Sequence, residues 1–238
     1  MMHMTKLYKG KYFSVLGDSV STLAGYNPDG YEVFYNWEKK RLADIHSPAD
    51  TWWGIVTEAL AGQMLVNASW SGSLVCKHPQ SEIESYGCST ARTSALSEGG
   101  RAPDVVMVFM GLNDFGHAMR PLPVPGKDGL DVFSVAYGVM LEKIRANYPN
   151  SEIWCFTLPT GFERGNGRKA SPVCCGYHID EYSRVIESCA ESAGCRTVRL
   201  HLFDAYESLD GWHPTANGMQ TIARAVLECV KEWCADDN

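Results

Sequence analysis

Apolar positions along this chain follow two patterns: short continuous runs, and longer segments in which apolar residues recur at helical spacing. The continuous runs predict buried strands, because a parallel strand covered on both faces is apolar throughout. The clearest run is DVVMVFM at residues 104–110. The other expected strands are residues 11–16, 64–68, 152–158 and 196–200.

The segments between these runs predict helices. Residues 51–63 carry Trp52 and Val56 at helical spacing, and Thr51 is suited to cap the first turn. Further helices are expected over residues 132–147, 178–193 and 214–233. Pro214 favours the first turn of the last helix, where no backbone N–H is needed.

Strands that alternate with helices form a parallel sheet with helices on both faces. The order of elements therefore predicts an α/β fold, a three-layer α/β/α sandwich of the flavodoxin-like type with about five parallel strands. Because no internal repeat or linker interrupts this order, we expect a single domain over residues 1–238, with an aromatic-rich insertion at about 25–50. Ligands of such sheets bind beyond the carboxyl ends of the strands.

The composition says little about the fold, but it restricts the partners that the protein can bind. Its 238 residues are 45% hydrophobic and 21% charged, which is ordinary for one globular core. The formal net charge of -7 argues against nucleic acid, whose phosphates require a basic surface. The basic cluster of Arg164, Arg168 and Lys169 lies in a Gly-rich stretch, so we expect a solvated loop, although a small anionic substrate group could use it.

The expected location and assembly of the protein depend on sequence features that are missing. Residues 1–10 contain no continuous apolar segment, so we expect no signal peptide and a cytoplasmic location; export stays open if a leader has been removed. No run of about 18 apolar residues is present, so no membrane span is expected. The nine cysteines lack metal-site spacing, which favours reduced thiols and no metal, while a Cys189–Cys195 disulfide and a homo-oligomer stay open.

The first candidate for chemistry is Ser19. The first expected strand runs directly into Gly17-Asp18-Ser19, and a helix is expected to begin there. A serine at this place is exposed at the carboxyl edge of the sheet, where its N–H can face a developing oxyanion. Taken alone, the same pattern is better explained as an ordinary helix cap.

The second candidate lies at the far end of the chain, just before the last expected helix. Asp210 precedes His213 by three residues. A turn of that length lets the carboxylate hold Nδ1–H of the imidazole and leaves Nε2 free as a base. The alternative is a turn-capping aspartate beside an exposed histidine.

Two more polar positions follow expected strands. Gly72, in the stretch Asn-Ala-Ser-Trp-Ser-Gly, allows close approach of the backbone and can present its N–H. Asn113, in Gly-Leu-Asn-Asp, follows the strongest expected strand and its amide could donate a second hydrogen bond. Singly, each is also explained as a turn residue.

Together, and in this order, these motifs resemble the SGNH hydrolase family, also called GDSL esterases. The positions that match the family's four signature residues and its third triad member are Ser19, Gly72, Asn113, His213 and Asp210. The resemblance extends from residue 13 to about 230. Leu112 departs from the small residue that is commoner before the family's Asn, and we expect its side chain to point away from the amide.

The resemblance implies a serine ester hydrolase that works through an acyl-enzyme without a metal or organic cofactor. Ser19 would be the nucleophile, His213 its base and Asp210 the group that orients the base. The N–H groups of Ser19 and Gly72 and the Asn113 side chain would form the oxyanion hole.

An aromatic segment follows the nucleophile and bears on the substrate. Its rings could line the active site and suit sugars, or they could build a satellite core or a dimer contact. The residues concerned are Tyr26, Tyr31, Phe34, Tyr35 and Trp37, followed by Trp52 and Trp53. The loops 115–129 and 159–177 should form the other walls, and neither is strongly apolar. We therefore expect short acyl groups, acetyl in particular, on a carbohydrate-like alcohol.

Other functions remain as alternatives. One is a lysophospholipase- or thioesterase-type lipid acyl hydrolase, and another is an acyltransferase that uses the same triad. A non-catalytic module could bind glycans through the aromatic rings, or phosphate through the hydroxyls of residues 19–22, but it would leave Asp210 and His213 unexplained. The Gly-x-Gly run at residues 165–167 does not link a strand to a helix, and a Gly-x-Ser-x-Gly elbow is absent.

Overall fold

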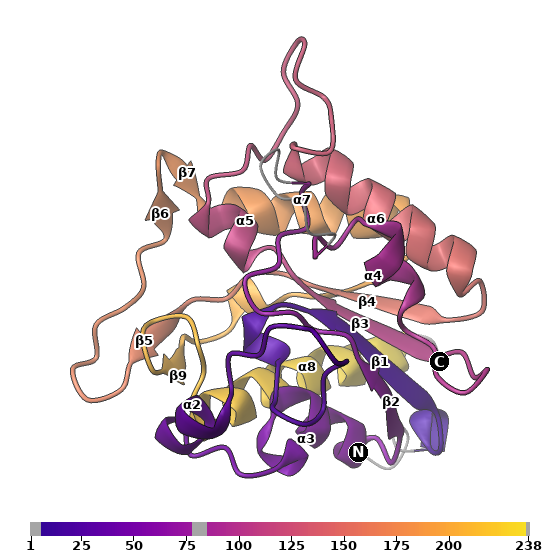
Figure 1. Ribbon diagram of the computed structural model, residues 1–238, viewed down its shortest axis with the longest axis vertical. Helices are drawn as coiled ribbons and strands as arrows, with labels where there is room; N and C mark the ends of the chain where they lie inside the picture. The colour runs from indigo at the N-terminus through magenta and orange to yellow at the C-terminus, as the bar shows by residue number, and fades with distance from the viewer. Residues whose placement is uncertain (1–5, 78–84, 237–238) are drawn as a thin grey trace.

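A five-stranded parallel sheet lies at the centre of the protein, in a computed structural model that describes residues 6–77 and 85–236. Its strand order is β2-β1-β3-β4-β8, of which Figure 1 labels β2, β1, β3 and β4. The strands are β1 (Tyr12–Gly17), β2 (Gln63–Asn67), β3 (Val105–Phe109), β4 (Glu152–Phe156) and β8 (Arg196–Val198). The predicted α/β fold with a parallel sheet of five strands is confirmed.

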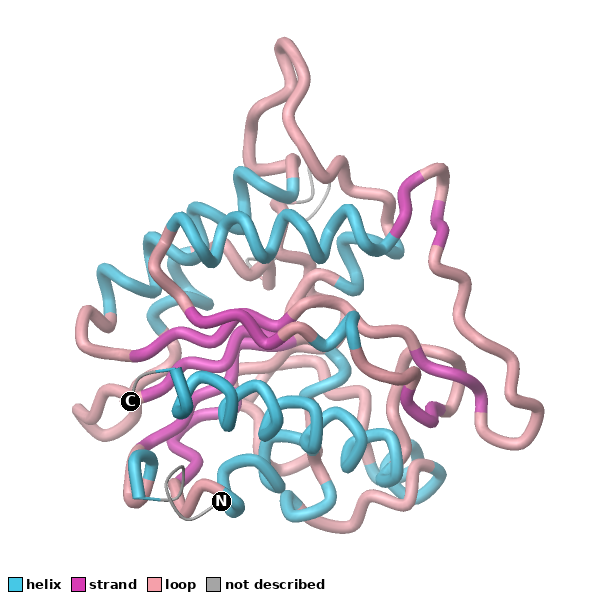
Figure 2. The backbone as a smooth tube through the Cα atoms, turned by 180° about the vertical axis from the view of Figure 1, so that it is seen from behind, coloured by secondary structure: helices cyan, strands magenta, loops and turns pink. Residues whose placement is uncertain are grey.

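Helices cover both faces of the sheet, as the two views of the backbone show (Figures 1 and 2). One face carries α3 (Trp52–Ala59) and α8 (Ala216–Asp236), which pack against each other. The opposite face carries α6 (Phe133–Asn147) and α7 (Ile179–Ser192), with the short α4 (Thr90–Ser94) beside α6. Two hydrophobic clusters, one on each face of the sheet, join these layers.

The short elements lie mainly in the connections at the carboxyl edge of the sheet. β5 pairs with β9 in parallel, and β6 with β7 in an antiparallel hairpin. The helical ones are η1 (Ser19–Ser21), α2 (Trp37–Leu42), η2 (Pro48–Asp50), α5 (Leu112–Gly116) and η3 (Leu200–Leu202). The strands are β5 (Gly161–Glu163), β6 (Val173–Cys174), β7 (Tyr177–His178) and β9 (Tyr206–Ser208).

Two helix starts differ from the prediction. Ser19 opens only the single turn η1, because the backbone of Thr22 is extended and ends the helix there. The hydroxyl oxygen of Thr22 instead accepts the N–H of Phe34. The last helix begins at Ala216 rather than at Pro214, because Pro214 forms a bridge with Ser208 that closes the preceding loop. A helix macrodipole therefore contributes little at Ser19.

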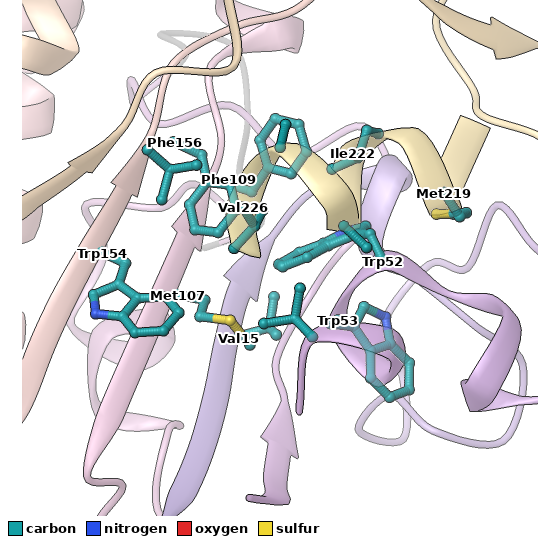
Figure 3. Close-up of a cluster of buried hydrophobic side chains, with 14 of the residues drawn as sticks. Val15, Trp52, Trp53, Met107, Phe109, Trp154, Phe156, Met219, Ile222 and Val226 are labelled. Atoms are coloured by element: carbon teal, nitrogen blue, oxygen red, sulfur yellow. The ribbon is translucent and has the colours of Figure 1, made fainter. Parts of the chain in front are cut away.

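The aromatic segment divides between core and surface. Tyr35, Trp52 and Trp53 are buried in the cluster shared by α3, α8 and the sheet, where Figure 3 shows the two tryptophans. Trp37 is 78% exposed. Phe34 is half-buried and lies against the imidazole of His213. The first three rings therefore belong to the main core, and Phe34 contacts the predicted site residue His213, so a role for the segment in an active-site wall stays a prediction.

The structure also bears on the thiols, the basic cluster and the membrane. All nine cysteines are free, so Cys189 and Cys195 do not pair here. Arg164 pairs with Asp44, and Arg168 with Glu163, so two of the three basic side chains are neutralised on an exposed loop. Within residues 6–77 and 85–236, no helix combines the length and the apolar character that crossing a membrane requires.

Candidate active site

The predicted site residues converge on the carboxyl edge of the sheet. Ser19 follows β1, Gly72 follows β2 and Asn113 lies in α5, directly after β3. Asp210 and His213 lie in the loop between β9 and α8. Because parallel strands point the same way, their carboxyl ends meet at one edge, and this topology brings together segments that are distant in the sequence.

Ser19, His213 and Asp210 form one hydrogen-bonded chain. The Ser19 Oγ lies 3.0 Å from Nε2 of His213, and Nδ1 of His213 lies 2.7 Å from Oδ2 of Asp210. With Nδ1–H donated to the carboxylate, Nε2 carries the lone pair that can accept the hydroxyl proton of Ser19. The arrangement can therefore activate an oxygen nucleophile.

Asp210 is held in its ionised form. Partial burial alone would raise its pKa, but the hydrogen bond and charge of His213 and the N–H groups of Trp212 and His213 outweigh burial. The net effect lowers the pKa to about 2. The two N–H groups donate to Oδ1 at 3.0 and 2.9 Å, which leaves Oδ2 for the imidazole. The carboxylate is thus both charged at neutral pH and fixed in direction.

The three predicted oxyanion donors come from the segments that follow β1, β2 and β3. The Nδ2 of Asn113 donates to the carbonyl of Ser73 at 3.1 Å, which orients the amide and leaves its second N–H unused. Gly72 has a φ of +76°, in the region that favours glycine. Over the described part of the chain, the N–H groups of Ser19 and Gly72 donate to no protein acceptor. These groups are available to a bound oxyanion.

A buried arginine that sequence reasoning missed supports this site. Arg92 is fully buried, and its Nη2 donates to the carbonyls of Gly17 and Ala68 at 3.0 and 2.8 Å. Its Nη1 donates to Ser73 Oγ at 2.7 Å. The guanidinium therefore ties the ends of β1 and β2 to the loop that carries Gly72. No local pattern marks Arg92 in the sequence, since its role depends on acceptors from distant segments.

Asp18 and Asp114 are the other buried charges next to the predicted site. Burial raises the pKa of Asp18 to about 7, although its Oδ1 accepts the N–H of Val20 at 3.1 Å. Burial also raises the pKa of Asp114 to about 6, although the hydrogen bonds that it accepts from the N–H groups of Val75 and Cys76 lower this pKa. These carboxyls hold η1 and fasten α5 to the loop after β2.

A cavity of about 400 Å³ opens beside Ser19 and His213. Its apolar lining comes from Leu112, Phe115, Val173 and Trp212. Its polar lining beyond the predicted residues comes from His117, Ser171 and Cys174. Both loops expected as walls contribute to this lining: Phe115 and His117 come from the first, and Ser171, Val173 and Cys174 from the second.

The alternative ligands find less support here. Ser21 and Thr22 are fully buried; Ser21 Oγ accepts Trp52 Nε1–H at 3.1 Å, and Thr22 Oγ1 donates to the Ser19 carbonyl at 3.0 Å. Their hydroxyls are therefore engaged within the protein rather than presented to a phosphate. Among residues 6–77 and 85–236, no three His, Cys, Asp or Glu side chains gather as a candidate metal site.

Comparisons with solved structures give the same fold. A protein described as a GDSL-like lipase from Bacteroides ovatus aligns with a TM-score of 0.72 and 23% identity, over 94% of this chain and 99% of its own. Another so described, from Bacteroides uniformis, gives 0.69 and 28% over 94% and 96%. A carbohydrate acetylesterase family member from Sinorhizobium meliloti gives 0.64 and 15% over 94% and 99%.

The sequence comparisons are consistent with the structural ones. A search of curated protein sequences gave no match. The family model for GDSL-like lipases and acylhydrolases matches residues 11–230, nearly the whole chain, which confirms the resemblance noted in the sequence. This chain therefore belongs to the GDSL-like lipase/acylhydrolase family.

Proposed function

We propose that this protein hydrolyses carboxylic esters through an acyl-enzyme on Ser19, with His213 as the base and Asp210 as its orienting carboxylate. The observation that carries this proposal is the hydrogen-bonded chain from Ser19 Oγ through His213 to Asp210, made across 194 positions of sequence. Chance proximity does not explain a chain in which each atom has the partner that its role requires.

The first half-reaction forms the acyl-enzyme. Nε2 of His213 takes the proton from Ser19 Oγ as this oxygen attacks the ester carbonyl carbon. The resulting imidazolium lies against the ionised Asp210. His213 then returns the proton to the leaving alcohol oxygen as the carbon–oxygen bond of the ester breaks. In the second half-reaction, His213 takes a proton from water as the water attacks the acyl carbon. His213 then returns this proton to Ser19 Oγ as the bond between serine and the acyl group breaks.

The oxyanion of each tetrahedral intermediate would accept hydrogen bonds from the N–H groups of Ser19 and Gly72 and from Asn113 Nδ2. Each such donor typically contributes a factor of about 10²–10³ to the rate. Arg92 supports this function indirectly, because it holds the carbonyls of Gly17 and Ala68 and the hydroxyl of Ser73. It therefore sets the spacing between two of the three donors.

For the substrate, we propose a short acyl group, acetyl in particular, on a carbohydrate-like alcohol. His117, Ser171 and Asn113 offer polar contacts at the cavity, and the Sinorhizobium meliloti relative is described as a carbohydrate acetylesterase family member. A lipid acyl hydrolase is the second candidate, because Phe115, Val173 and Trp212 give the same cavity an apolar side.

The test is hydrolysis of p-nitrophenyl acetate, butyrate and octanoate by the wild type and by Ser19→Ala. We expect activity that is highest on acetate and lost in the variant, with an unchanged circular dichroism spectrum. Retained activity in Ser19→Ala would contradict the mechanism. A preference for octanoate would replace the acetyl proposal with the lipid one, and acylated alcohol products in the presence of a sugar would indicate transfer rather than hydrolysis.

A further inference from the structure

The ring of Phe34 lies flat on the imidazole of His213. Their centroids are 3.5 Å apart and their planes differ by 6°. Two neutral aromatic rings prefer offset or edge-to-face arrangements with centroids about 4.5–7 Å apart. A cation is different, because it is attracted to the negative face of the ring. The observed stack is therefore one that becomes stronger when His213 takes up a proton.

The backbone around Phe34 is tied to both sides of the proposed triad. The N–H of Phe34 donates to Thr22 Oγ1 at 3.0 Å, and the same hydroxyl donates to the carbonyl of Ser19 at 3.0 Å. The neighbouring Tyr35 donates its hydroxyl to the carbonyl of Pro214 at 2.6 Å. Residues 34–35 thus connect the turn of the nucleophile with the residue that follows His213.

Both nitrogen edges and one face of the His213 imidazole are in contact with other side chains. Its Nδ1 edge contacts Asp210, its Nε2 edge contacts Ser19, and one of its faces is covered by Phe34. Lys39 also lies near this stack, with its Nζ over the Phe34 ring at 5.9 Å. The shorter distance to His213 makes the imidazole the principal partner of the aromatic ring.

We propose that Phe34 is a positioning residue that holds the plane of the His213 ring and stabilises its imidazolium form in the transition state. This inference rests on the proposed function. An interaction that is stronger with the imidazolium than with the neutral ring lowers the barrier rather than merely binding substrate. The flat stack also restricts rotation of the imidazole away from Ser19. Phe34 therefore acts on kcat, through His213, without touching the reacting atoms.

The first experiment compares kcat and KM on p-nitrophenyl acetate for the wild type, Phe34→Leu and Phe34→Tyr. We expect Phe34→Leu to lower kcat by about five- to thirtyfold, the range of a partly desolvated cation–π contact, with KM within about twofold. Phe34→Tyr keeps the aromatic face and should stay within about threefold of the wild type. Trp37→Leu is the matched control, since Trp37 belongs to the same segment but is exposed, and it should leave kcat unchanged.

A second series separates the electronic effect from packing. Replacing Phe34 with mono-, tri- and pentafluorophenylalanine weakens and then reverses the negative ring face with little change in size. A stepwise fall in kcat at constant melting temperature supports the proposal. Equal kcat across the series overturns it, and so does an unchanged kcat in folded Phe34→Leu. If Phe34→Leu fails to fold, the fluorinated series decides alone.

The two proposals fail in different ways. Retained activity in Ser19→Ala would remove the triad mechanism, whatever the Phe34 variants do. Loss of activity in Ser19→Ala, together with wild-type kcat in every Phe34 variant, would keep the triad and remove the role of Phe34. The imidazole C–H proton resonances of His213 give a readout independent of turnover: the ring current of a stacked Phe34 should shift them upfield, and Phe34→Leu should abolish that shift.

Discussion

Asp210 and His213 lie three residues apart in one loop, and their side chains meet at 2.7 Å while two backbone N–H groups hold the other carboxylate oxygen. The loop that makes this contact is closed by the bridge between Ser208 and Pro214 and by a hydrogen bond from the N–H of Leu209 to the carbonyl of His213 at 2.8 Å. One closed loop therefore holds Asp210 and His213 together, and the sheet brings Ser19 to the same place.

Changing the carboxylate should affect the rate rather than the fold. In Asp210→Asn we expect kcat on p-nitrophenyl acetate to fall by about 10²–10⁴-fold, because the amide cannot stabilise the imidazolium and can select the wrong tautomer. Asp204→Asn, in an exposed position of the same region, should behave as the wild type. Steady-state kinetics checks both variants, and wild-type kcat in Asp210→Asn would refute the assigned role.

The same carboxylate should leave a mark on acid stability. Its pKa is lowered in the folded protein from 3.8 to about 2, so it contributes stability above the unfolded value. That contribution is lost as the pH falls through the folded value. Between about pH 5 and pH 2, unfolding free energies from urea titrations should therefore fall more steeply for the wild type than for Asp210→Asn. Parallel curves would show that the carboxylate is not coupled to folding.

Removing one of the proposed oxyanion donors should slow the chemical step. We expect Asn113→Ala to lower kcat by about 10²–10³-fold with a small change in KM, because the donor matters most when negative charge develops on the carbonyl oxygen. Asn217→Ala, on the exposed side of α8, is the matched control. A change confined to KM would assign Asn113 to substrate binding instead.

The buried guanidinium should be required for stability. Arg92→Met leaves the Ala68 carbonyl and the buried Ser73 hydroxyl without the guanidinium and removes one of the two donors to the Gly17 carbonyl, so we expect the free energy of unfolding to fall by about 3 kcal/mol. Arg224→Met, on the exposed face of α8, should change it by less than about 0.5 kcal/mol. Chemical denaturation measures both, and equal stability of the two variants would contradict the role of Arg92.

Asp18 should make the protein less stable as the pH rises. Its pKa is raised from 3.8 to about 7, chiefly by burial, so the folded protein holds a proton that the unfolded chain has lost. Stability therefore declines between these two values. Asp18→Asn keeps an acceptor for the N–H of Val20 and removes the charge. Its melting temperature should therefore exceed that of the wild type at pH 8 and match it at pH 4. Asp29→Asn, at an exposed position, is the control at both pH values. Calorimetry that finds no such pH dependence would show that Asp18 titrates normally.

Much of the fold could be predicted because its signals are local. β3 is buried at all five positions, as its continuous apolar run predicts, and the Oγ1 of Thr51 caps α3 by accepting the Gly54 N–H at 3.1 Å. The helix expected over residues 51–63 is shorter than predicted and ends at Ala59, because the chain must turn at Gly62 to enter β2. Its apolar spacing continues past this turn, so periodicity alone could not locate the end.

The order of strands and helices was enough to predict the parallel sheet, and the ordered motifs, through their family resemblance, selected Ser19, Gly72, Asn113, Asp210 and His213, because both signals are carried by short segments. Other features depend on contacts between distant segments. Only the tertiary structure brought Arg92 into hydrogen-bond contact with Gly17, Ala68 and Ser73. Only it showed that the helix at Ser19 is a single turn. Only it separated Phe34, which stacks on His213, from Tyr35, which is buried in the core. Burial and ring stacking are decided by what packs against a residue from elsewhere in the fold, and a local pattern contains no record of that partner.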